Sequence, residues 1–346
     1  MSVHRLVPAG PDQPPAHPLV ARFACDRPSA ADENTHPEFA ADAVAGLSRQ
    51  QKAIPAKYLY DRFGSMIFEA ICDQPEYYPS RTEAMLLETA APDIAAAAAG
   101  ERPLIEFGSG ASSKTRILLD AMPQIGRYIP IDISASALQQ ARIGLESDYP
   151  GLSVEPLHAD FTRLSQGCRK LAGGCALGFF PGTTIGNFTP VEAFAMLSDW
   201  RRLLGRGSLL LLGVDLRKDP RVLVPAYDDA AGVTAAFNLN LLTRMNRELR
   251  ADFDLSLFDH RAVWNAAASR IEMHLVSLCR QIVTVAGRVF AFAEGETIHT
   301  ENSYKYVPQT FVDLARGAGW AAERAWLSPD PTYGLFLFKA RNRPAA

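Results

Sequence analysis

A glycine-rich turn between an apolar strand and a helix is the feature of this sequence that most directly suggests chemistry. Leu104–Phe107 is a short apolar run, and Gly108 and Gly110 separate it from the helix-compatible segment Lys114–Met122. Glycines let a backbone approach a ligand closely, and a helix N-terminus presents unpaired N–H groups and the positive end of a dipole. The pattern is typical of a nucleotide-binding α/β unit.

Three classes of ligand compete for this turn. The dinucleotide pattern G-x-G-x-x-G fails at its third glycine, where Ser113 stands, and the same serine breaks a phosphate-binding loop that Gly108 and Lys114 would otherwise fit. The looser E-x-G-x-G turn of S-adenosylmethionine (SAM) methyltransferases is satisfied fully by Glu106, Gly108 and Gly110. A glycine pair after a strand is often only a tight turn, so other residues have to decide.

Acidic residues after the next two strands favour SAM. Asp132 ends the segment Tyr128–Asp132, about 20 residues beyond the turn, where a carboxylate pairs with ribose hydroxyls. Asp160 and Phe161 follow a third strand, Leu152–Leu157, and could bond an adenine amino group and cover its ring. Either acid alone is more typical of a helix cap or turn, but ligands of open α/β sheets bind at the carboxyl ends of strands, so their shared position favours a nucleoside.

The elements around these residues predict an α/β fold with a Rossmann-like, doubly wound sheet, because residues 101–215 alternate strand and helix. A fourth strand, Ala176–Phe180, leads into a polar Gly/Asn loop, and a fifth, Ser208–Asp215, is apolar throughout, as for a strand buried on both faces. The expected crossover helices are Lys114–Met122, Ser134–Ser147 and Pro190–Leu204.

The flanking regions are expected to build a smaller α+β substrate-binding part. Helical composition dominates 36–100, and the residues after 215 read as helices broken near Gly232, followed by alternating segments that include a hairpin at Ala286–Arg288. We divide the chain into a mobile tail (1–34), an N-terminal helical region contributing to the substrate pocket (35–100), the SAM-binding core (101–215), an inserted substrate-binding domain (216–300) and a C-terminal segment returning to the core (301–346).

Composition argues against several functional classes. The 346 residues are 48% hydrophobic and carry a net charge of −3, which suits a soluble globular protein and gives no basic excess for nucleic acid. Apolar runs such as Leu209–Leu212 are far too short to span a bilayer, and no signal peptide is visible. The five cysteines are scattered and the seven histidines lack ligand spacing. We therefore expect a cytoplasmic monomer that acts on small molecules, without metal, membrane or nucleic acid.

Longer blocks carry a more specific signal than any glycine motif and run from about residue 45 to the C-terminus. They are Lys57–Asp61, Pro75–Glu83, Glu106–Arg116, Gly182–Asn187, Ala226–Thr234, Phe237–Asn240, Ile271–Met273 and Thr300–Ser303. Together they resemble the histidine-specific Nα-methyltransferases of ergothioneine biosynthesis, which convert L-histidine into its trimethylated betaine, hercynine, with three SAM molecules.

The resemblance implies individual roles. For SAM, it places Gly108 under the methionine portion, Lys114 at its carboxylate, Asp132 at the ribose, and Asp160 and Phe161 at adenine. Gly110 of the same turn is a further cofactor-binding residue. For the substrate, it places Asn187 and Tyr227 at the carboxylate, Tyr60 and Gly182 near the amine, Tyr77 near the imidazole, Glu301 and Ser303 on the two imidazole nitrogens, and Phe68, Thr184 and Met273 around the pocket.

The implied chemistry is an in-line displacement at a sulfonium by a neutral amine, which needs alignment and exclusion of water but no covalent nucleophile. Tyr60 is the candidate catalytic residue, since it or a water beside it would accept the departing proton. Three alternatives stay open: a SAM-dependent methyltransferase acting on another amino acid or small amine, a P-loop-like nucleotide hydrolase, and a SAM-binding protein without catalysis.

Overall fold

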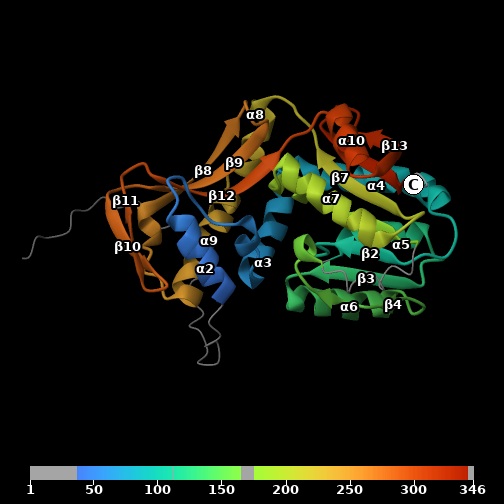
Figure 1. Cartoon of the computed structure of the whole chain (residues 1–346), viewed down its shortest axis with the longest axis horizontal. Coiled ribbons are helices and arrows are strands. Elements are labelled where there is room, and N and C mark those ends of the chain that lie inside the picture. The colour runs from blue at the N-terminus through green and yellow to red at the C-terminus, as the bar shows by residue number, and fades with distance from the viewer. Residues whose placement is uncertain (1–36, 111, 165–174, 342–346) are drawn as a thin grey trace, which may run out of the picture.

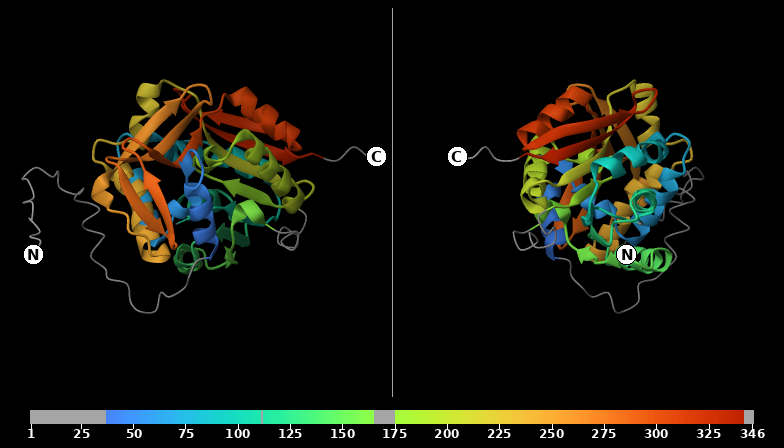
Figure 2. Two further views of the ribbon diagram at one scale, coloured as in Figure 1. Left: turned by 60° about the vertical axis from the view of Figure 1, so that its left-hand side comes forward. Right: turned by 90° about the vertical axis from the view of Figure 1, so that its right-hand side faces the viewer.

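The computed structural model describes residues 37–110, 112–164 and 175–341; the predicted tail, 1–34, lies outside these ranges. Within them the chain forms an eight-stranded sheet, a four-stranded sheet and a two-stranded hairpin. The larger sheet and the smaller one lie at opposite ends of the molecule (Figure 1). Figure 2 shows the same division from a second direction, with the orange strands of the smaller sheet apart from the green strands and red helix of the larger part.

The eight-stranded sheet is doubly wound, with the order β13-β14-β7-β6-β2-β3-β4 and with β5 also paired to β3. Every residue of β2, β6 and β7 is buried, as expected for strands covered on both faces. This confirms the predicted Rossmann-like α/β sheet. Its strands are β2 (Leu104–Phe107), β3 (Arg127–Asp132), β4 (Ser153–Val154), β5 (Leu157–His158), β6 (Leu177–Phe180), β7 (Leu209–Asp215), β13 (Trp320–Leu327) and β14 (Tyr333–Ala340).

Helices cover both faces of this sheet. One face packs against α7 (Pro190–Leu204) and α10 (Pro308–Gly317), and the other against α4 (Tyr78–Ala97), α5 (Ser113–Ala121) and α6 (Ala135–Asp148). Local caps explain where two of them begin: Ser134 accepts from the N–H of Ala137 in α6, and Thr189 forms a capping box with Glu192 in α7.

One local prediction was wrong, and one strand was missed. The expected third strand is split into β4 and β5, because Pro156 between them has no N–H to donate to a neighbouring strand. The edge strand β13 was not predicted. Most of its residues are exposed or half-exposed, so it lacks the apolar alternation that marks a half-buried strand.

The four-stranded sheet has the order β1-β12-β9-β8. The hairpin β10–β11 lies beside this sheet, at the left-hand side of Figure 1. One cluster of buried residues joins this sheet to α2, α3 and α9. The predicted boundary at residue 300 falls inside β12, whose residues up to Tyr304 pair with β9. The elements are α2 (Pro37–Leu47), β1 (Lys52–Ala53), α3 (Arg62–Cys72), α9 (Val233–Leu249), β8 (Phe258–Asn265), β9 (Arg270–Ser277), β10 (Gln281–Val285), β11 (Arg288–Phe292) and β12 (Thr297–Tyr304).

Among the helices of the described ranges, none has both the length and the apolar character that crossing a bilayer requires.

Candidate active site

The glycine turn after β2 meets the acid at the end of β3. Gly108 has φ +71°, and a Cβ there would lie 3.2 Å from the ring of Phe161, so glycine is what allows this ring to cover the turn. The N–H of Gly110 donates to Asp132 Oδ2 at 3.0 Å, and the N–H of Ser134 donates to Oδ1 at 2.8 Å. Four of the predicted SAM residues therefore lie together, at the carboxyl ends of β2, β3 and β5. They are Gly108, Gly110, Asp132 and Phe161.

Asp160 and Phe161 are held by local contacts. Asp160 Oδ1 accepts from the N–H of Thr162 at 2.8 Å, so this carboxylate caps the 3₁₀ turn η2 (Phe161–Arg163). The Phe161 ring makes edge contacts with Phe180 and Trp200, at centroid distances of 5.5 and 6.2 Å. The capping interpretation of Asp160 is thus correct, and one of its oxygens already has a partner.

Glu106, the acid of the E-x-G-x-G turn, points into the core. It is 1% exposed and accepts from the hydroxyls of Thr115 in α5 and Tyr128 in β3. Burial raises the pKa of its carboxyl to about 8, against the lowering effect of these two hydrogen bonds. Glu106 therefore ties β2, α5 and β3 together beneath the turn.

Lys114 forms an ion pair with Glu83, a buried residue of α4 that the sequence analysis had not singled out. Both oxygens of Glu83 accept from the N–H of Gly182 at 2.8 Å, and the hydroxyl of Tyr333 donates to the carbonyl of Gly182 at 2.7 Å. The loop after β6 is thereby held beside the predicted SAM residues. Thr184 lies next to this glycine, with Oγ1 3.8 Å from the position a Cβ on Gly182 would occupy.

Glu301 and Ser303 lie on the same face of β12, as their spacing predicts. Both are buried, and a bulge between His299 and Glu301 precedes them. Met273 of β9 is the direct cross-strand neighbour of Glu301. Burial raises the pKa of the Glu301 carboxyl to about 7, partly offset by the nearby ammonium of Lys305.

Asn187 reaches Glu301 because its loop rests on the backbone of β12. A Cβ on Gly186 would lie 2.9 Å from the carbonyl oxygen of Tyr304, so only glycine permits this approach of η4 (Thr184–Asn187). Asn187 Nδ2 stands 3.5 Å from Glu301 Oε2. Asn187 lies in η4, which follows β6 of the larger sheet, and Glu301 lies in β12 of the smaller one, so the two parts of the molecule meet at these side chains.

A buried ion pair holds the two site hydroxyls. Lys305 Nζ donates to Asp215 Oδ2 at 2.6 Å, to Tyr227 Oη at 2.8 Å and to Ser303 Oγ at 2.7 Å, and the two hydroxyl oxygens lie 2.7 Å apart. Lys218 forms a second ion pair with Asp215. Burial alone would raise the pKa of Asp215, but Lys305 and Lys218 together hold it below its usual value.

Sequence reasoning missed Lys305 and Asp215 as site residues. A usable signal existed for each: Lys305 follows Glu301 and Ser303 at the two-residue period of a strand, and Asp215 ends the fifth predicted strand. Neither signal shows that the two residues meet.

An aromatic cluster completes the arrangement. The ring of Phe68 makes edge contacts with Tyr60 and Tyr77 at 5.6 and 6.0 Å, and Tyr77 contacts Tyr227 at 6.3 Å. Phe237, which had not been singled out, packs on Tyr60 at 5.4 Å. Burial raises the pKa of the Tyr60 and Tyr77 phenols well above the usual range. The ring contacts and the Tyr227–Ser303 hydrogen bond thus link five of the predicted substrate residues: Tyr60, Phe68, Tyr77, Tyr227 and Ser303. Asn187 and Met273 are joined to Glu301.

The fold and these contacts define the class of protein. A doubly wound sheet with a glycine turn after β2 and acids at the end of β3 and after β5 is the fold of a SAM-dependent methyltransferase.

Comparison with known proteins gives the particular family. Residues 39–340 match the family described as "Histidine-specific methyltransferase, SAM-dependent", and the chain belongs to it. This confirms the resemblance and removes the nucleotide-hydrolase alternative.

Two relatives are named "Histidine N-alpha-methyltransferase". The protein of Mycolicibacterium smegmatis is 45% identical over 302 residues, covering 86% of this chain and 93% of the relative. That of Mycobacterium tuberculosis is 40% identical over 305 residues, with the same coverage. Among solved structures, the CcbJ methyltransferase from Streptomyces caelestis aligns over 82% of this chain and 100% of its own, at 17% identity and a TM-score of 0.47.

Proposed function

We propose that this enzyme transfers three methyl groups from SAM to the α-amino nitrogen of L-histidine, forming hercynine in ergothioneine biosynthesis. The observation that carries the proposal is a buried carboxylate, Glu301, on the same strand face as Ser303 in a chain of the histidine-specific family. The two closely related proteins that bear the histidine methyltransferase name support the same substrate.

Glu301 suits an imidazole because it needs a donor. Among the described residues its carboxylate accepts one side-chain hydrogen bond, a long one from Asn187. A buried carboxylate left short of donors is costly, and an imidazole N–H supplies one. Phenylalanine or leucine in the same place would leave Glu301 with only the long hydrogen bond from Asn187, so the site rejects them strongly.

Counting hydroxyl protons indicates how Tyr227 and Ser303 serve the substrate. The ammonium of Lys305 donates its three hydrogen bonds to Asp215, Tyr227 and Ser303. A fourth hydrogen bond joins the hydroxyls of Tyr227 and Ser303 and uses one of their two protons. One hydroxyl proton is left over. If Ser303 donates to Tyr227, the remaining hydroxyl is that of Tyr227, which donates to the substrate carboxylate next to Asn187. If Tyr227 donates to Ser303, the remaining hydroxyl is that of Ser303, which donates to the second imidazole nitrogen.

On the SAM side, we assign the ribose to Asp132, whose oxygens each hold one backbone N–H and keep lone pairs for the two hydroxyls. Phe161 covers adenine beside Asp160, and Gly108 and Gly110 lie under the methionine portion. Lys114, oriented by its pair with Glu83, binds the methionine carboxylate. The protein contributes alignment of nitrogen, methyl and sulfur and exclusion of water.

Tyr60 acts as a neutral phenol rather than as a base. Its raised pKa, caused first by burial and then by the charge of Glu301, disfavours the phenolate. Its oxygen therefore accepts from the amine, and the proton leaves through water. The aromatic rings of Tyr60, Phe68 and Tyr77, which lie in edge contact with one another, would also stabilise the permanent quaternary cation that the third methylation creates.

The test is mass spectrometry of purified protein incubated with SAM and an equimolar pool of the twenty amino acids. Three added methyl groups on histidine alone are expected. Methylation of another amino acid would keep the fold and methyl donor but overturn the roles of Glu301 and Ser303. No methylated product, with SAM binding measured separately, would leave a SAM-binding protein without this activity. A monomeric state and a cytoplasmic location stay predictions.

A further inference from the structure

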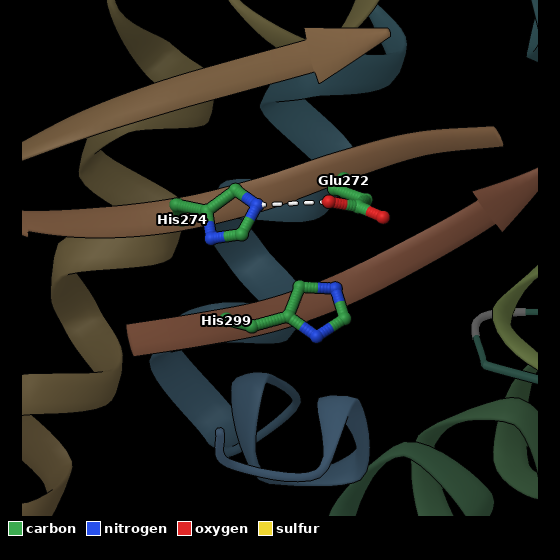
Figure 3. A group of neighbouring side chains, drawn as sticks. All are labelled: Glu272, His274 and His299. Carbon is green, nitrogen blue, oxygen red and sulfur yellow. Dashed lines mark hydrogen bonds and ion pairs between the residues drawn. The ribbon is translucent and has the colours of Figure 1, made fainter. Parts of the chain in front are cut away.

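A second cluster of chemically capable side chains lies on the opposite face of the smaller sheet. In β9, Ile271, Met273 and Leu275 face the buried core, so the alternate residues Glu272 and His274 face away from it. His299 of β12 is the direct cross-strand neighbour of His274. Figure 3 shows Glu272 and His274 on one strand and His299 on the next, with their side chains on the same side.

The three side chains offer ligand atoms at close range. One ligating atom from each residue lies within 4.8 Å of the other two. The two imidazole rings are tilted by 33° with centroids 5.0 Å apart, and His274 Nε2 lies 3.2 Å from Glu272 Oε2. His274 Nδ1 is buried and has no hydrogen-bond partner among the described residues. A buried imidazole nitrogen without a partner is a group whose environment is incomplete.

Neighbouring groups prepare these residues as ligands. Glu272 Oε1 accepts from Asn265 Nδ2 at 2.8 Å and from Arg270 Nε at 2.7 Å, which orients the carboxylate and leaves Oε2 toward His274. Burial would raise the pKa of Glu272, but these hydrogen bonds lower it to about 2, so it is ionised. Burial lowers the pKa of both imidazoles, so each keeps a lone pair at neutral pH.

We propose that Glu272, His274 and His299 form a binding site for a divalent transition-metal ion of the Zn²⁺ type, outside the site assigned to methyl transfer. Two imidazoles and one carboxylate are a ligand set that suits Zn²⁺, with water in the fourth position. Ligand atoms in a tetrahedral zinc site stand about 3.4 Å apart, so no pair of these ligand atoms has to close by more than about 1.4 Å on binding.

The metal would join β9 to β12 across their hydrogen-bonded ladder. His299 Nε2 also lies 3.0 Å from the backbone carbonyl oxygen of Glu301. The proposed metal ligand His299 is therefore in direct contact with the backbone of a residue that we assign to the substrate. The positive charges of Arg270 and Arg261, the cross-strand neighbour of His274, oppose a bound cation. We therefore expect weaker binding than in a site with thiolate ligands.

The test is titration of the untagged full-length protein with Zn²⁺ by calorimetry, together with Co²⁺ as a spectroscopic probe of coordination. We expect one site per chain that raises the melting temperature. His274→Ala and His299→Ala should each lower the Zn²⁺ affinity by about 100-fold or more, since loss of an outer partner alone costs about 10–100-fold. Glu272→Gln keeps the size of the side chain, removes its charge and should weaken binding in the same direction.

His158→Ala is the matched control, because it removes an exposed histidine at the end of β5 and should leave Zn²⁺ binding unchanged. Melting curves in EDTA establish that each variant is folded. The proposal is overturned if the wild-type chain binds neither ion, or if folded His274→Ala and His299→Ala variants bind Zn²⁺ as tightly as the wild type.

Discussion

Replacing Lys305 by methionine removes the charge that holds the two site hydroxyls while keeping most of the length of the side chain. Its ammonium is fully buried and bonds Asp215, Tyr227 and Ser303. Removing one member of a buried ion pair costs about 3–5 kcal/mol of stability. Lys218 still neutralises Asp215, so we expect a loss near the lower end, about 3 kcal/mol.

The same substitution should weaken histidine binding. Tyr227 and Ser303 each lose a charge-assisted hydrogen bond that sets where the hydroxyl points, and such a bond is worth about 1.5–3 kcal/mol. The loss of one such bond at the substrate lowers kcat/KM for histidine roughly 10- to 150-fold. Because we assign the hydroxyls to substrate binding rather than to reaction, the change should fall on KM, and SAM affinity should stay within about twofold.

The assay is steady-state methylation with histidine varied at saturating SAM, beside SAM calorimetry and a melting curve. Lys218→Met is the matched control, since that lysine pairs with the same carboxylate but bonds Tyr78 instead of Tyr227 and Ser303. It should lose stability without a comparable rise in KM. A folded Lys305→Met variant with wild-type KM for histidine would refute the positioning role.

Three further outcomes are expected. Glu301→Ala should abolish most histidine turnover while SAM binding, measured by calorimetry, survives; loss of SAM binding would mean that the imidazole assignment is wrong. Asp132→Ala should weaken SAM binding by about 1.5–3 kcal/mol, the value of a charge-assisted hydrogen bond, and unchanged affinity would contradict the ribose assignment. His260 is buried, and burial lowers its pKa, while Nε2 bonds the carbonyl of Tyr227 at 2.8 Å and Nδ1 bonds Asn238 Nδ2 at 2.9 Å. Its neutral form therefore stabilises the fold fully above the unfolded pKa of about 6.5, and this contribution is lost as pH falls toward the folded value, with a slope of up to about 1.4 kcal/mol per pH unit. Urea unfolding between pH 7.5 and 5 should show a shallower pH dependence in His260→Gln, and an equal slope in both proteins would count against a buried neutral imidazole.

Local patterns explain why much of the fold was predictable. The helix α7 has the predicted bounds, Pro190–Leu204, because a proline in the first turn and a capping threonine mark its start within a few residues. The run Leu209–Asp215 reads as a buried strand because it is apolar over its whole length. The edge strand β13 could not be read in this way, because its side chains mostly face solvent.

The residues of the proposed site likewise fall into those that local patterns or the family resemblance indicated and those that only the tertiary structure brought together. The register of strand ends places Asp132 near the glycine turn, so sequence reasoning found this residue. Glu301 and Ser303 were implied by the resemblance to a family, and alternation along one strand explains why they share a face. The resemblance to a family supplied most of the other roles. Lys305 with Asp215, and Glu83 with Gly182, are 90 and 99 residues apart, and no local pattern predicts that they meet.

The sequence by itself determined the doubly wound core, the position of the glycine turn and the family, because propensity, periodicity and motif spacing act over a few residues. The tertiary structure decided which distant groups share a buried volume. It placed Lys305 beneath the hydroxyls, made Glu301 a carboxyl with a raised pKa and brought His274 beside His299 through the register of β9 and β12. Burial and strand pairing are properties of the packed chain, because desolvation and long-range contacts arise only when both sheets close around the same residues.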